Sequence, residues 1–133
     1  MKLRHLMNYR AEMKKSVINI PIYGFKLTYI QIEGKEEAKD IKSVLTRLKI
    51  SKKDIDRVYD NIVRAAVNGG ETYILPRKRE MLVLIYEHDS EKARRNTVNH
   101  ELRHVVDRIM EWGSINDTEA AAFLQGWLSV KIY

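Results

Sequence analysis

The pattern of predicted strands and helices places this 133-residue chain in the α+β class. Segments rich in β-branched and aromatic residues occur early and in the middle of the chain. Segments with apolar residues at helical spacing lie between them, and two more helices end the chain. We therefore expect one domain over residues 1–133, with a small antiparallel or mixed sheet of about three strands packed by helices.

The first strand-forming segment follows a basic N-terminal stretch. Residues 1–15 are polar and basic, and we expect a flexible arm or a short helix there. Residues 16–33, SVINIPIYGFKLTYIQIE, are rich in β-branched and aromatic residues, interrupted at Pro21 and Gly24. This segment predicts one long bent strand or two short strands, near a sheet edge because proline has no N–H to donate.

Two helices are predicted next. Residues 35–50 place five apolar residues at helical spacing: Ala38, Ile41, Val44, Leu45 and Leu48. A second helix is expected from Ser51, a suitable N-cap, with an inward face of Ile55, Val58, Ile62, Val63 and Ala66. The NGG sequence at 68–70 is expected to end it.

The second half of the chain contains two more strands and two more helices. ETYILP (71–76) and EMLVLIY (80–86) predict strands joined by the basic turn RKR (77–79). A helix is expected from about Ala93 to Trp112, and a final helix over 117–130.

Composition excludes several classes of protein. Hydrophobic residues make up 44% and charged residues 32%, which is typical of a soluble globular domain. The longest apolar run is shorter than a membrane span, and the N-terminus lacks the apolar core of a secretory signal, so we expect a cytoplasmic protein without membrane contact. The absence of cysteine excludes a thiolate ligand or nucleophile, so any metal would be held by His, Asp or Glu.

The net charge of +6 does not by itself identify a partner. The basic clusters, at 2–15, 47–57, 77–79 and 92–95, share no obvious element and carry no recognition motif. We interpret them as solvated surface and do not expect a nucleic-acid partner, although an acidic protein partner would also fit.

The sequence HELRH at 100–104 places two histidines four residues apart. On a helix the apolar residues around it form one stripe: Val98, Leu102, Val105, Ile109 and Trp112. His100 and His104 fall on the opposite side with Asp107 and Glu111, where two imidazoles can converge on one ion, and Glu101 lies between the two faces. The alternative interpretation is a solvated, charged helix face.

A zinc site of this type needs a third ligand. Glu119, on the first turn of the final helix, is the favoured candidate, and Asp117 is the second choice. Asn116 and Glu119 also have the spacing of a capping box, in which case Glu119 only caps the helix. Asp107, one turn after His104, either accepts the distal N–H of that histidine or belongs to the solvated surface.

NHELRHVVD, followed by DTEAAAFLQGWL, resembles the gluzincin class of zinc metallopeptidases. The likeness is to small peptidases encoded by phages and mobile elements and, more distantly, to the ImmA/IrrE type, and it covers residues 71–130 as a minimal zincin-like core. It implies a zinc-dependent peptidase acting on a protein or peptide substrate. His100, His104 and Glu119 would hold Zn²⁺, and Glu101 would be the general base for a zinc-activated water.

The resemblance also implies that EMLVLIYE is the edge strand that pairs with an extended substrate. An oxyanion-stabilising side chain is expected beside the zinc, with Tyr73, His88 and Tyr133 as candidates by residue type only, while His5 has no assigned role. The alternative function is a catalytically inactive structural or binding protein of a phage or mobile element, in which zinc only stabilises the fold.

Overall fold

The computed structural model of the chain describes residues 14–133. The predicted N-terminal arm and His5 therefore lie outside the described residues, except for Lys14 and Lys15, which begin the first strand. No helix within the described part of the chain is both long and apolar enough to cross a lipid bilayer.

The predicted α+β class is confirmed. The elements in chain order are β1 (Lys14–Ile20), β2 (Phe25–Gln31), the 3₁₀ turn η1 (Lys35–Glu37), α2 (Ala38–Arg47), α3 (Lys52–Val63), β3 (Gly70–Ile74), β4 (Glu80–Ile85), α4 (Glu91–Trp112) and α5 (Thr118–Ile132). The sheet has four strands rather than about three, because the segment 16–33 forms two strands joined by a turn at Pro21–Gly24.

The sheet is mixed, with strand order β1-β2-β4-β3. β1 pairs antiparallel with β2, β2 pairs parallel with β4, and β3 pairs antiparallel with β4. β1 is an edge strand, as the proline predicts, and β3 is the other edge. The prediction that EMLVLIYE forms the edge strand is wrong, since β4 is hydrogen-bonded on both sides. A continuous apolar run is typical of a strand buried on both faces.

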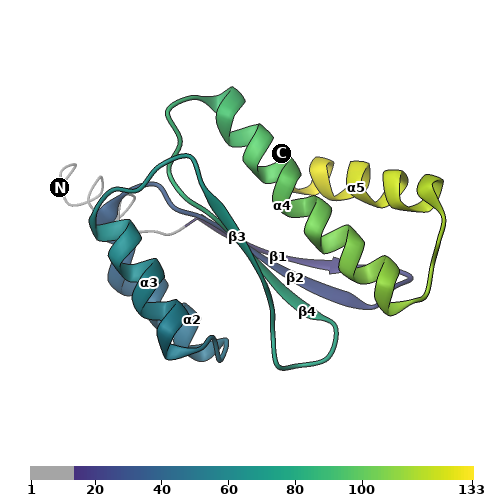
Figure 1. Ribbon diagram of the computed structural model, residues 1–133, viewed down its shortest axis with the longest axis horizontal. Coiled ribbons are helices and arrows are strands. Elements are labelled where there is room, and N and C mark those ends of the chain that lie inside the picture. Colours follow the sequence, from purple (N-terminus) through teal and green to yellow (C-terminus); the bar gives the residue numbers. More distant parts are fainter. Residues whose placement is uncertain (1–13) are drawn as a thin grey trace, which may run out of the picture.

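The helices form two layers, one on each face of the sheet (Figure 1). Side chains of the two central strands alternate between the layers, as the pleat requires. Leu27, Met81 and Val83 pack with α4 and α5. Ile30, Leu82 and Leu84 pack with α2 and α3. The sheet therefore separates two apolar cores, and α4 lies against one of them.

The ends of the helices follow the sequence in part. Ser51 caps α3 as predicted, accepting a hydrogen bond from the backbone N–H of Asp54. α3 ends at Val63 rather than at the NGG sequence, and Ala65 just beyond it has a left-handed φ of 57°. The N-cap of α5 is Asp117, not Asn116, since the Asp117 side chain accepts hydrogen bonds from the N–H groups of residues 119 and 120. The predicted capping box is therefore wrong, because the residue three positions after the observed cap is Ala120, which has no side-chain acceptor.

Candidate functional site

Helix α4 carries the histidine motif and is fixed by its apolar stripe. Val98, Leu102, Val105 and Ile109 are fully buried, as their spacing predicts. Trp112, the fifth predicted member, is 47% exposed, so that part of the prediction is wrong. It is the last residue of α4, where its ring makes an edge contact with Phe25 instead of entering the core.

The two histidines lie on the exposed side of α4, opposite the stripe, as predicted. Their Nε2 atoms are 3.2 Å apart, and the two rings are perpendicular with centroids 4.8 Å apart. Two nitrogens bound to one tetrahedral zinc at about 2.0–2.1 Å would be about 3.3 Å apart. The histidine pair thus already has the separation that a shared ion requires.

Glu101 lies on a different face of α4 and is buried, with only 6% exposed. Its Oε1 accepts a hydrogen bond of 2.6 Å from the Thr72 hydroxyl on β3. The contact follows from helix geometry, since Glu101 precedes the fully buried Leu102 and points toward the sheet edge beside the stripe. The carboxylate is therefore held by the edge strand, not by solvent.

A cleft of about 590 Å³ lies between α4 and β3. Helix α4 contributes Glu101, His104, Asp107, Arg108 and Glu111 to its lining. The edge strand contributes Gly70, Glu71, Thr72 and Ile74. One histidine of the motif and the motif glutamate thus line a single opening together with an edge strand.

Gly70 allows β3 to approach α4 closely. A Cβ atom at this position would lie 2.9 Å from Thr97 Cγ2 and 3.0 Å from both Glu101 Cγ and Ile85 Cδ1. These distances are shorter than normal van der Waals contacts, so no larger side chain fits without displacing the motif glutamate.

Glu119 lies on the first turn of α5 and is exposed. Within residues 14–133, no group of three or more His, Cys, Asp or Glu side chains is placed to hold one ion. The structure therefore brings His100 and His104 together but does not add Glu119 or Asp117 to them, and the ligand set remains a prediction.

Asp107 does not bond to His104. Its Oδ1 accepts a hydrogen bond of 3.0 Å from Nε of Arg103, one turn earlier on the same helix. Of the two predicted roles, the exposed surface residue agrees with this contact.

None of the three candidate oxyanion residues lines the cleft. His88 bonds to the backbone carbonyl of Tyr86 and to Thr97, and Tyr133 lies beneath Arg94 and Arg95. The cation that does line the cleft is Arg108, which sequence reasoning missed. Its signal was available, because Arg108 follows Glu101 by seven residues, two helical turns, and so shares its face.

A hydrogen-bonded network fixes the other side of β3. Glu71 accepts hydrogen bonds from Arg57, Tyr73 and Tyr86, and Arg57 also donates to the Tyr73 hydroxyl. Burial favours the neutral form of Glu71, but the three donors outweigh it and hold its pKa below the ordinary value. Burial, and then the bond to Glu71, raise the pKa of Tyr73, so this residue acts as a neutral donor. The network anchors β3 to α3.

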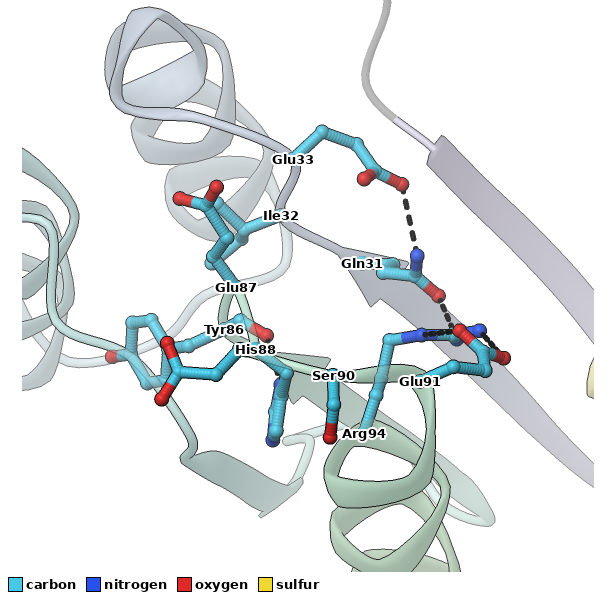
Figure 2. Close-up of a pocket in the computed structure, with 10 residues that line it drawn as sticks. Gln31, Ile32, Glu33, Tyr86, Glu87, His88, Ser90, Glu91 and Arg94 are labelled. Atoms are coloured by element: carbon cyan, nitrogen blue, oxygen red, sulfur yellow. Dashed lines mark hydrogen bonds and ion pairs between the residues drawn. The ribbon is translucent and has the colours of Figure 1, made fainter.

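A second pocket, of about 330 Å³, lies at the carboxyl ends of β2 and β4, beside the start of α4 (Figure 2). Gln31 is its central residue. It donates to Glu33 at 2.8 Å and accepts from Arg94 at 2.7 Å, and Arg94 in turn pairs with Glu91. No residue of the histidine motif lines this pocket. Gln31, Glu33, Glu91 and Arg94 thus bind one another and attach the first turn of α4 to β2, whereas His88 and Asp89 bond to Thr97 and Asn68 outside the pocket.

Comparison with protein-family models, curated proteins and solved structures found no match to this chain.

Proposed function

We propose that the chain is a zinc-dependent metallopeptidase whose active site is the cleft between α4 and β3. The observation that carries the proposal is the 3.2 Å separation of the His100 and His104 Nε2 atoms, which matches the spacing around one tetrahedral ion. The zincin-like arrangement supports it further, since the motif glutamate and an edge strand line the same cleft as His104.

In this proposal His100, His104 and Glu119 hold the metal and Glu101 is the general base. Zinc, when bound, makes an attacking water acidic enough to react at neutral pH and places a positive charge near the substrate carbonyl. Glu101 accepts the proton of that water and delivers it to the leaving amine. Thr72 positions the Glu101 carboxylate through its hydroxyl, and the Arg108 guanidinium supplies positive charge on the same wall of the cleft.

The substrate in this proposal is a protein or peptide in extended conformation. β3 is an edge strand with one side unpaired in the sheet, so a peptide can add to it by backbone hydrogen bonds along the cleft. The substrate-pairing role that the resemblance implied for β4 is here proposed for its neighbour β3.

Metal titration tests the ligand set. We expect wild type to bind one Zn²⁺ in calorimetry, and His104→Ala and Glu119→Gln each to weaken binding at least tenfold. Asp107→Asn and Glu111→Gln are matched controls, because both carboxylates line the cleft with His104. If Glu111→Gln weakens zinc binding and Glu119→Gln does not, Glu111 rather than Glu119 is the third ligand. The absence of stoichiometric zinc binding by wild type would refute the metal site.

Glu101→Gln separates an enzyme from a protein with structural zinc. If Glu101 is the base, this variant retains zinc and stability but loses about 10²–10⁴-fold in hydrolysis of a quenched-fluorescence peptide library. A wild type that holds zinc and cleaves no member of the library would favour the structural role instead.

A further inference from the structure

Basic residues from two distant parts of the sequence meet at the turn between β3 and β4. Arg47 and Lys49, at the end of α2, line one pocket together with Arg77. Arg77, Lys78 and Arg79 line the adjoining pocket on the other side of the turn. We call these five exposed residues the basic surface. The clusters that appeared unrelated in sequence are thus partly assembled by the fold.

An aromatic side chain adjoins the basic surface and orders one of its cations. The guanidinium of Arg79 lies over the exposed ring of Trp112, 4.4 Å from its centroid. Such stacking holds the planar fork of an arginine in one orientation, which favours bidentate binding of a carboxylate. Among the described residues, none of the five cations forms a salt bridge, so their charges are available to a partner.

The basic surface continues into the cleft. The pocket beside Trp112 shares Ile74, Met81 and Arg108 with the cleft that contains Glu101 and His104. Beyond this shared wall the charges are paired, because the Glu71, Asp107 and Glu111 carboxylates that line the cleft form salt bridges with Arg57, Arg103 and Arg108. The unpaired positive charge is thus confined to the basic surface, which matches a peptide with acidic residues on one segment better than a nucleic-acid strand charged along its whole length.

We propose that the basic surface docks an acidic peptide segment that continues from the chain lying along β3. The partner is a protein in which a run of Asp or Glu residues adjoins the segment bound in the cleft. Docking uses the five cations, of which Arg79 is stacked on Trp112, and it requires neither metal nor hydrolysis. The placement of the rest of the partner along β3 rests on the proposed function, whereas docking on the basic surface can be measured without it.

Fluorescence anisotropy of a labelled eight-residue peptide of alternating Glu and Ala tests the proposal. We expect binding that weakens with salt, persists in chelator, and falls about tenfold or more in Arg77→Glu/Arg79→Glu, since each exposed pair contributes about 2–5-fold. The matched control, Lys35→Glu/Lys92→Glu, changes net charge equally at exposed positions outside the surface and should lose less than threefold.

Equal losses in the two double variants would show that net charge alone drives binding, and would overturn the proposal. So would the absence of binding by wild type, or tighter binding of an oligothymidine of equal charge. If Arg77→Glu/Arg79→Glu melts at lower temperature, Arg77→Glu/Lys78→Glu tests the same surface without the stacked pair. Peptide binding that persists while zinc binding fails would refute the proposed function and leave this inference standing.

Discussion

Replacement of Thr72 by valine tests the link between the edge strand and the motif glutamate. Valine keeps the β-branched shape and replaces with a methyl group the hydroxyl that donates to Glu101 Oε1 at 2.6 Å. Glu101 is 6% exposed, so water cannot readily replace the lost donor. A hydrogen bond to a charged group contributes about 1.5–3 kcal/mol. We expect the free energy of unfolding of Thr72→Val to fall by this amount, out of a total of about 5–15 kcal/mol.

Urea denaturation followed by circular dichroism measures this change, and the melting temperature should fall by roughly 5–10 °C. Thr72→Ser keeps the hydroxyl and is the matched control, with an expected loss below about 1 kcal/mol. A double-mutant cycle with Glu101→Ala should give a coupling energy of at least about 1 kcal/mol. Equal losses for valine and serine, or additive effects in the cycle, would refute the positioning role of Thr72.

Three further predictions concern the neighbourhood of the cleft and the start of α5. Gly70→Ala should lower the free energy of unfolding by about 1–3 kcal/mol, because the new Cβ would overlap three side chains. Gly126→Ala should raise it by about 0.5–1 kcal/mol, because no atom lies within 4 Å of the new Cβ and alanine favours the helix. Urea denaturation should therefore give changes of opposite sign for the two variants. Asp117→Ala should cost about 0.5–2 kcal/mol and Asn116→Ala much less, and equal losses would contradict the observed cap. Because the pKa of Glu71 is lower in the folded chain than its ordinary value of 4.5, its ionised form stabilises the fold at neutral pH, and this stabilisation is lost as the pH falls below 4.5. Arg57→Ala removes one cause of the low pKa, so its free energy of unfolding should fall less between pH 6 and pH 3 than that of wild type.

The types of the elements were predictable because their patterns are strong. Ser51 begins α3 with its side chain as cap, and Ile55, Val58 and Ile62 are buried as their helical spacing predicts. Val63 and Ala66 were also predicted to face inward, and that part is wrong, because Val63 is the exposed last residue of α3 and Ala66 lies beyond its end. The neighbours of β4 were not predictable from its own residues. A strand with both faces buried shows no alternation, and β4 pairs with β2, which lies about fifty residues earlier in the chain.

The geometry of the motif was also predictable, because one helix contains it. Its stripe faces the sheet, so the histidines must face away and Glu101 must lie at the margin. The partner of Glu101 was not predictable. Thr72 precedes it by 29 residues on a strand whose place at the sheet edge depends on the order of all four strands.

The third ligand depends on how α5 is rotated, a property that no local pattern specifies. Gln125 donates to the backbone carbonyl of Asn99, which fixes where the helices meet. From that contact, Glu119 lies about 9 Å along α5 and His104 lies about 7.5 Å along α4, both toward the turn that joins the helices, at a rise of about 1.5 Å per residue. The two residues are therefore at nearly the same height along the helix pair. At 100° per residue, however, Glu119 lies roughly 120° around α5 from Gln125, and it is exposed. Rotation of α5 rather than its length therefore decides whether Glu119 reaches the histidines, and buried Leu124 and Leu128 set that rotation.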